Sequence, residues 1–169
     1  MNRRRDLERL VREHQPMIGR ICASYESDRE LARDLAQDVL LAIWRALPAH
    51  RGASSIKTFV ARIAQFRAIS HVARHSKRPH LTEIDPTLVD VQPLPDAQVI
   101  AADERNRLLM AVRRLPLAYR EPVVLTLEDF TPPEIAEAIG VTPNVVAIRL
   151  SRARTLLRTL LGENDHENR

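Results

Sequence analysis

Apolar residues recur along much of the chain at intervals of three and four, the spacing that places them on one face of an α-helix. Residues 6–24 have this spacing, although Pro16 is expected to break or restart the helix there. Residues 28–47 have it again, and Ser27 followed by Glu30 predicts a capping box at the start of that helix. No segment convincingly alternates apolar and polar residues as a strand does, so we predict an all-α protein.

Two helical units are separated by a segment of different composition. A third helix is expected from a cap at Ser54 or Ser55 to about Ser76. Residues 77–96 have no strong period and contain four prolines, which predicts a linker. A second helical unit follows over about 97–161. We therefore predict two small helical domains, residues 1–76 and 97–169, joined by a Pro-rich acidic linker at 77–96.

The C-terminal unit contains the sharpest motif. Thr131-Pro-Pro-Glu134 is a capping box that opens a short helix, and Gly140 ends that helix. Thr142-Pro143 caps a longer helix that extends to about Leu161. A short helix, a glycine-containing turn and a second helix predict a helix-turn-helix, whose second helix fits the major groove of DNA. The alternative is an ordinary α-hairpin within a bundle.

The helix predicted at 28–47 carries large apolar groups on its polar side. One broad face is apolar, whereas the opposite face carries Asp34, Gln37, Asp38, Leu41, Trp44 and Arg45. Exposed apolar groups bordered by carboxylates are typical of a protein-docking surface, and tryptophan is a favoured anchor there. The alternative is that Trp44 packs on a neighbouring helix.

Charge is distributed in long blocks of one sign. The 169 residues include 26 basic and 22 acidic ones, a net charge of +4, and all but two of the basic residues are arginine. No acid occurs from Val39 to Thr82, whereas residues 83–104 hold six acids and no base. Residues 149–158 add four arginines without an acid. Two basic blocks around an acidic one indicate two surfaces that face a polyanion, although solvated helix faces are the alternative.

Other observations exclude several classes of protein. No apolar run approaches the roughly 18 residues of a membrane span, so no membrane insertion is expected. The one cysteine, Cys22, fits a reducing cytosol, and we predict a cytoplasmic protein. His71 and His75 have the i, i+4 spacing of zinc ligands, but no third ligand is evident and arginines surround them. We therefore expect no metal, no cofactor and no catalytic residue.

At this point the sequence resembles a known family, the extracytoplasmic-function (ECF) sigma factors of bacterial RNA polymerase. The segment Asp34–Leu47 resembles the helix that binds the polymerase clamp, and Phe59–Ala64 resembles the start of the promoter-melting helix. The segments Leu115–Glu121 and Glu134–Arg154 contain the motifs that resemble the fourth domain of these factors. The similarity covers most of the chain outside the linker.

The resemblance implies a promoter-specificity subunit that binds core RNA polymerase and recognises and melts promoter DNA. Contacts with the clamp helices of the largest subunit are implied for Asp34, Gln37, Asp38, Leu41 and Trp44. Contacts with the minus-ten element are implied for His50, Arg51, Ser55, Lys57, Thr58, Arg62, Gln65 and Arg74. Contacts with the minus-thirty-five element are implied for Thr142, Asn144, Val145, Ile148, Arg149, Ser151, Arg152 and Arg154. The polymerase flap and an anti-sigma factor are further partners that the resemblance implies.

The chain departs from the family pattern at a few positions. Phe66 and Ser70 stand where the family usually has asparagine and aspartate, and Phe66 shares a helical stripe with Phe59 and Ile63. This stripe favours a core role for Phe66 over base stacking. In the helix from Pro143, Ala147 and Ile148 replace the family's usual lysine and serine. Ile148 suits contact with a thymine methyl group or simple exposure equally well. Such departures leave open a sigma-like mimic that binds an anti-sigma factor without driving transcription. An ordinary helix-turn-helix repressor is a third alternative.

Overall fold

The computed structural model describes residues 3–76 and 96–167, and these ranges contain helices and no strand, as predicted. The predicted linker lies outside the described residues, apart from Asp96, which opens a helix. The elements, in chain order, are α1 (Arg3–Ala23), α2 (Arg29–Ala46), the 3-10 turn η1 (Leu47–Ala49), α3 (Ile56–His75), α4 (Asp96–Arg114), α5 (Leu117–Leu127), α6 (Pro132–Ile139) and α7 (Pro143–Glu167).

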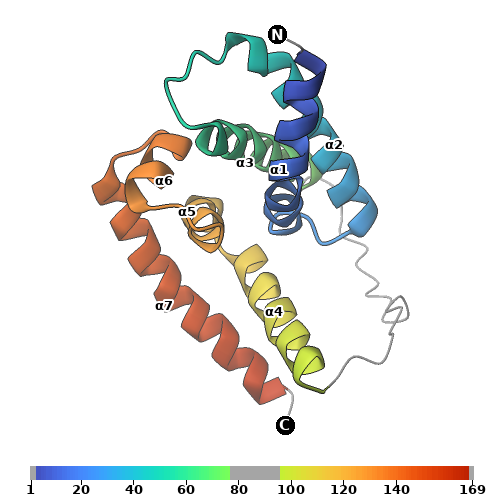
Figure 1. The fold of residues 1–169 in the computed structure, drawn as a ribbon. Coiled ribbons are helices and arrows are strands. Elements are labelled where there is room, and N and C mark those ends of the chain that lie inside the picture. Colours follow the sequence, from blue (N-terminus) through green and yellow to red (C-terminus); the bar gives the residue numbers. More distant parts are fainter. Residues whose placement is uncertain (1–2, 77–95, 168–169) are drawn as a thin grey trace.

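The first three helices pack against one another and form the N-terminal half of the molecule (Figure 1). Their apolar faces meet in a fully buried core that includes Ile18 and Ile21 of α1, Val39 and Ile43 of α2, and Val60 of α3. Burial of each such side chain stabilises the fold by about 1.5–3 kcal/mol. This packing fixes which faces of α2 and α3 remain outside.

α1 continues through Pro16, so the prediction of a break at this proline is wrong. Proline removes one backbone hydrogen bond inside a helix and disfavours it by about 3 kcal/mol. Buried apolar residues lie on both sides of the proline, Leu10 before it and Met17 and Ile18 after it. Their burial in the same core holds both segments in one helix.

The start of α2 differs by one residue from the prediction. Asp28, not Ser27, is the N-cap, and its Oδ1 accepts hydrogen bonds from the N–H groups of Glu30 at 2.8 Å and Leu31 at 3.0 Å. A carboxylate at this position accepts hydrogen bonds from free N–H groups, and its negative charge interacts favourably with the positive end of the helix dipole. The cap at the start of α3 is Ser55, one of the two predicted residues.

The C-terminal half has the predicted helix-turn-helix. The Glu134 carboxylate accepts hydrogen bonds from the N–H and the hydroxyl of Thr131, both at 2.7 Å, and so closes the start of α6. Gly140 ends α6 with a φ of 73°, a left-handed conformation that glycine adopts without strain. α7 then packs against α5, α6 and α4, and α4 runs beside it in Figure 1.

The two halves touch each other mainly through α3, which packs against α6 and α5. A single cluster of buried apolar residues includes members of both halves, among them Val60 and Ala64 of α3 and Ile135 of α6. Figure 1 shows α5 and α6 drawn up to α3, while α4 and α7 extend away from it. The arrangement therefore brings the predicted promoter-melting helix against the predicted DNA-binding unit.

Candidate functional site

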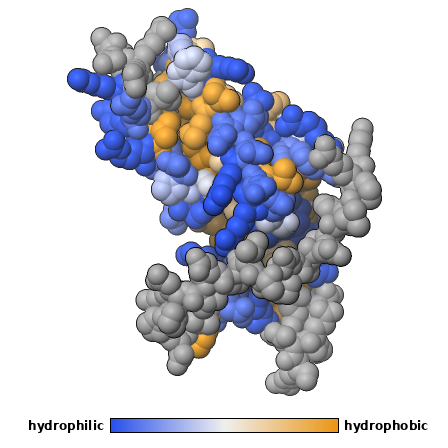
Figure 2. Space-filling view, turned by 90° about the vertical axis from the view of Figure 1, so that its right-hand side faces the viewer, coloured by the Kyte–Doolittle hydropathy of each residue, from blue (hydrophilic) through white to orange (hydrophobic). Residues whose placement is uncertain are grey.

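The outer face of α2 exposes the two large apolar residues that the sequence singled out. Leu41 is 52% exposed and Trp44 is 57% exposed, whereas Leu35, Val39 and Ile43 on the opposite face are buried. Trp44 is therefore not packed away against a neighbouring helix. Viewed from the right-hand side of Figure 1, the upper part of the molecule has hydrophobic groups gathered among hydrophilic ones (Figure 2). An exposed tryptophan beside an exposed leucine is the composition of a protein-docking anchor.

Carboxylates border this face of α2, as expected. Asp34 and Gln37 are exposed, and Asp38 forms an ion pair with Arg67 of α3 at 3.5 Å. An open pocket of about 340 Å³ lies between α2 and α3, lined by Leu31, Asp34, Leu35, Asp38, His71, Arg74 and His75. The predicted polymerase-contacting residues thus share one helix face and its edge.

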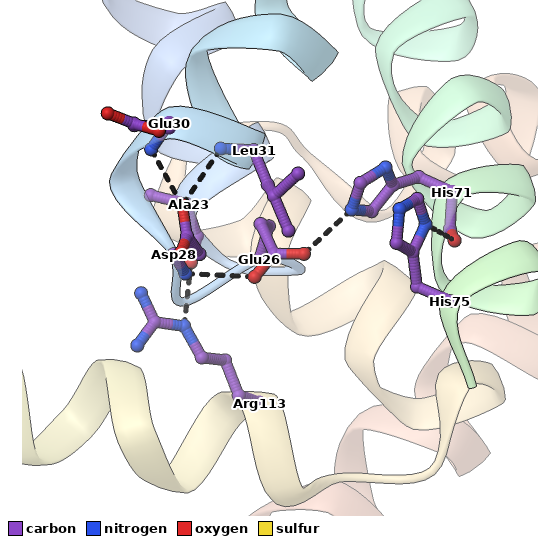
Figure 3. Close-up of polar contacts among 8 residues, drawn as sticks. All are labelled: Ala23, Glu26, Asp28, Glu30, Leu31, His71, His75 and Arg113. Atoms are coloured by element: carbon purple, nitrogen blue, oxygen red, sulfur yellow. Dashed lines mark hydrogen bonds and ion pairs between the residues drawn. The ribbon is translucent and has the colours of Figure 1, made fainter. Parts of the chain in front are cut away.

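The end of α1 and the turn after it contact both α3 and the C-terminal half (Figure 3). Glu26 bonds the Nε2 of His71 on α3 at 2.7 Å and accepts the N–H of Asp28 at 2.8 Å. From the other side, the Nε of Arg113 on α4 donates to the carbonyl oxygen of Ala23 at 2.8 Å. Burial lowers the pKa of Arg113, and the Glu26 carboxylate opposes this effect. His71 therefore has a structural partner in this turn.

The residues predicted to bind the minus-ten element do not all face solvent. Arg51, Arg62 and Arg74 are exposed. The His50 ring lies tilted against the ring of Phe59, with 4.5 Å between the centroids. Ser55 caps α3 by accepting the N–H of Thr58 at 3.0 Å, and Thr58 is buried. The last two members of this set, Lys57 and Gln65, point into the contact with the C-terminal half.

Three of these side chains donate hydrogen bonds to backbone carbonyl groups of the C-terminal half. Lys57 Nζ donates to the carbonyl of Glu128 at 2.9 Å, and Arg62 Nη2 donates to that of Glu137 at 2.9 Å. Gln65 Nε2 donates to the carbonyl of Glu121 at 3.2 Å, and its oxygen accepts the hydroxyl of Tyr25. The polar ends of these residues are therefore engaged within the molecule.

The same contact contains an ion pair and a cation–π contact that the sequence did not indicate. Arg20 of α1 donates two hydrogen bonds to the Glu128 carboxylate, at 2.8 and 2.7 Å, and this carboxylate raises the pKa of Arg20. Lys57 Nζ also lies 4.2 Å from the centre of the Phe130 ring. We call these contacts, together with the three donors to carbonyl groups, the closing contacts.

The outer face of α7 is exposed as the helix-turn-helix pattern predicts. Val146, Leu150 and Ala153 are buried, while the predicted minus-thirty-five residues Thr142, Asn144, Ile148, Ser151, Arg152 and Arg154 are exposed. The other two predicted residues, Val145 and Arg149, are half-buried, and Arg149 lies 3.5 Å from the Glu121 carboxylate. Burial raises the pKa of Glu121 and the neighbouring arginine opposes this rise.

Phe66 is not a core residue, so that expectation is wrong. It is 68% exposed, whereas its neighbours on the expected stripe, Phe59 and Ile63, are half-buried against the core. The apolar stripe of α3 is wider than the face that the neighbouring helices cover, so Phe66 at its edge is left exposed. The sequence analysis did not predict two features of these surfaces, the exposure of Phe66 and the ion pair between Arg20 and Glu128.

The described residues hold no group of three or more potential metal ligands. None of the described helices is long and apolar enough to cross a membrane.

Two family models match the chain in order. The model described as Sigma-70 region 2 matches residues 10–78, and the model described as Sigma-70, region 4 matches residues 105–157. The first match covers α2 and α3 with most of α1, and the second covers the helix-turn-helix with the end of α4 and α5. The two matches therefore include the exposed face of α2, the helix α3 and the exposed face of α7.

Similar sequences are named as sigma factors. The chain is 28% identical over 161 residues to RNA polymerase sigma factor NccH of Alcaligenes xylosoxydans xylosoxydans, a match that covers 90% of this chain and 84% of that protein. It is 32% identical over 153 residues to ECF RNA polymerase sigma factor SigG of Mycobacterium tuberculosis, covering 76% of this chain and 41% of the relative.

Solved structures have the same fold. CnrH in complex with the cytosolic domain of CnrY superposes with a TM-score of 0.71 at 22% identity, covering 95% of this chain and 90% of that one. RpoE in complex with the anti-sigma factor NepR from Bartonella quintana gives 0.69 at 21% identity, covering 93% and 97%.

Proposed function

This chain belongs to the sigma-70 family, in the ECF group of sigma factors, and from that premise we propose how its two halves divide the work of a promoter-specificity subunit. The factor binds core RNA polymerase and directs initiation at promoters. Residues 1–76 bind the polymerase and the minus-ten element, and residues 97–169 bind the minus-thirty-five element. The chain makes and breaks no covalent bond itself, and it acts in the cytoplasm where the polymerase works.

The observation that carries this proposal is the order of the two matched regions, each of which exposes a face suited to its role. On α2, Leu41 and Trp44 are exposed beside the carboxylates of Asp34 and Asp38, and these residues with Gln37 contact the polymerase. On α7, exposed Arg152 and Arg154 contact phosphates while Asn144 and Ile148 reach base edges. Neither face is covered by the rest of the described chain.

Promoter binding through this part of α3 competes with the contact to the C-terminal half. Lys57, Arg62 and Gln65 each donate one hydrogen bond to carbonyl groups of α5, α6 and the turn between them, which leaves only their remaining N–H groups for DNA until the halves separate. Each such hydrogen bond contributes about 0.5–1.5 kcal/mol net, so the closed arrangement is stable but reversible. Binding to core polymerase, which engages both halves separately, supplies the free energy for opening.

Reconstitution with core polymerase tests the proposal. Run-off transcription on a library of genomic promoter fragments, followed by sequencing of the transcripts, is expected to give a small set of specific start sites. The variant Arg152→Ala with Arg154→Ala is expected to lose these transcripts while still binding core polymerase. If the purified chain directs no specific transcript, the proposed function is wrong.

The sigma-like mimic gives a different result in the same assay. A mimic binds an anti-sigma factor tightly and yields no transcript with any promoter fragment. The likeness to folds solved as complexes with CnrY and NepR fits an anti-sigma partner for this chain under either function. Transcription from the library therefore decides between the two.

A further inference from the structure

Arg149 lies on the inner edge of α7, unlike Arg152 and Arg154, for which a minus-thirty-five contact is also expected. Helical spacing places it three residues after Val146 and four before Ala153, and both of these side chains are fully buried. The Arg149 side chain is itself only 27% exposed, whereas Arg152 and Arg154 are exposed residues. α7 passes α5 here (Figure 1), so the Arg149 side chain belongs to the contact between these two helices.

A carboxylate of α5 faces Arg149 in this contact. The Nη1 of Arg149 donates to the Oε2 of Glu121 at 3.5 Å, and the Glu121 side chain is only 19% exposed. Burial raises the pKa of Glu121 and the neighbouring Arg149 opposes this rise, so each side chain compensates the charge of the other. A DNA phosphate that approached Arg149 would also approach the Glu121 carboxylate and be repelled by it. Arg149 is therefore a poor phosphate ligand while this pair exists.

The two exposed arginines have no such partner. Among the described residues, no ion pair involves Arg152 or Arg154. Their charges remain available to phosphates, as the proposed function requires. The three arginines with an expected minus-thirty-five contact thus fall into two groups that the sequence pattern does not separate, one directed into the protein and one directed outwards.

The pair between Arg149 and Glu121 also acts on the orientation of α7. The apolar contacts of buried Val146 and Leu150 are non-directional and allow the helix to roll on its neighbours. A hydrogen-bonded ion pair has a preferred geometry, so it fixes this rotation. Ile148 directly precedes Arg149, and Arg152 follows it by about one turn. The direction in which these two neighbours face DNA therefore depends on the rotation that Arg149 sets.

We propose that Arg149 is a positioning residue of the recognition helix, which holds α7 in its DNA-reading orientation through Glu121 and makes no contact with DNA itself. This inference rests on the proposed function and deepens it, since it separates the residues that orient α7 from those that read the promoter. It also replaces the minus-thirty-five contact that the resemblance implies for Arg149.

The test measures promoter binding by reconstituted holoenzyme, on a promoter fragment identified by run-off sequencing. Fluorescence anisotropy at several salt concentrations gives the affinity and its salt dependence, and circular dichroism gives the melting temperature of each free variant. The variants are Arg149→Ala, Glu121→Gln and the double variant. Arg152→Ala is the comparison for a lost phosphate contact, and Arg12→Ala is the control for net charge. Glu121→Gln leaves in place the main-chain carbonyl that accepts the closing contact from Gln65.

We expect Arg149→Ala and Glu121→Gln each to lower promoter affinity about two- to fivefold, the factor that corresponds to one partly exposed ion pair. The double variant should bind no more weakly than either single variant, because both changes remove the same interaction. The salt dependence should keep the wild-type slope in all three, whereas Arg152→Ala flattens it by about 0.9. Arg12→Ala should match the wild-type chain in both affinity and slope.

A flatter slope for Arg149→Ala than for the net-charge control overturns the inference, because Arg149 then contacts phosphates, although the proposed function stands. Wild-type or tighter binding by Glu121→Gln overturns it as well, and so do losses that add in the double variant. A lowered melting temperature with wild-type promoter affinity also overturns it, since the pair then only stabilises the fold. A wild-type chain that directs no specific transcript overturns the proposed function and this inference together.

Discussion

Arg20 and Glu128, which are 108 residues apart in the sequence, form a two-bond ion pair that joins α1 to the end of α5. The Glu128 side chain is nearly buried, whereas that of Arg20 is largely exposed. The pair lies at the same junction as Lys57, which donates to the Glu128 carbonyl. Glu128 of the C-terminal half therefore accepts hydrogen bonds from side chains of both α1 and α3.

Reversing one charge of this pair is expected to open the molecule. Loss of an ion pair with one exposed partner costs about 0.5–1 kcal/mol, which shifts the ratio of closed to open forms about two- to fivefold. Repulsion between like charges in Arg20→Glu adds to this shift. Small-angle scattering is expected to show a larger radius of gyration for Arg20→Glu and recovery in the double variant Arg20→Glu with Glu128→Arg.

Arg12→Glu is the matched control, because Arg12 is an exposed arginine on the same helix. It changes the net charge equally and should leave the radius of gyration unchanged. Equal expansion of the control and Arg20→Glu would show that net charge, and not this ion pair, holds the halves together.

Trp44→Ala is expected to weaken binding to core polymerase about tenfold or more, since tryptophan anchors carry much of an interface's binding energy. The melting temperature should change little because Trp44 is already 57% exposed. Arg12→Ala, which truncates an exposed side chain of α1, should leave core affinity unchanged. Surface plasmon resonance with immobilised core enzyme measures both, and an unchanged affinity of Trp44→Ala would exclude α2 as the docking face.

Arg152→Ala is expected to lower the affinity for minus-thirty-five duplex and to reduce the salt dependence of binding. Each lost phosphate contact flattens the plot of log affinity against log salt concentration by about 0.9. The measurement is fluorescence anisotropy at several salt concentrations, with Arg12→Ala as the control of equal charge. A slope equal to that of the control would mean that Arg152 does not contact DNA phosphates.

Cys22 is expected to react slowly while the protein is folded. Burial raises the pKa of its thiol from 9.0 to about 12, so at pH 8 the thiolate is about a thousandfold rarer than in the unfolded chain. Alkylation by iodoacetamide, followed by mass spectrometry with and without urea, measures this difference. Since the neutral thiol is favoured in the fold, stability is unaffected below pH 9 and falls as the pH rises from 9 towards 12. Equal alkylation rates would contradict the buried position.

The helices and the helix-turn-helix could be predicted because their signals are local. Gly140 and the Thr131–Glu134 pair each act within a few residues, so the sequence displays the cause directly. The helix does not break at Pro16, because the local cost of the proline is exceeded by the burial of Leu10 and Met17, which only the tertiary structure reveals. Local sequence signals therefore predict where helices form better than they predict whether a helix continues through a proline.

The contact between the halves could not be predicted for a different reason. Arg62 and Gln65 were expected to face DNA because a basic or amide side chain gives the same signal whether its acceptor is a phosphate or a carbonyl. Exposure of Phe66 was also hidden, because a pattern shows which residues are apolar but not how wide a face the neighbouring helices cover. Which acceptor a polar side chain meets depends on the three-dimensional arrangement of the helices.

The acceptors for Lys57, Arg62 and Gln65 are all main-chain atoms, which every amino acid supplies. They belong to Glu128, Glu137 and Glu121, none of which lies on α7. Substitutions on the exposed face of α7 therefore leave the three hydrogen bonds between the halves in place, so the proposed DNA preference and the closed arrangement can change independently of each other.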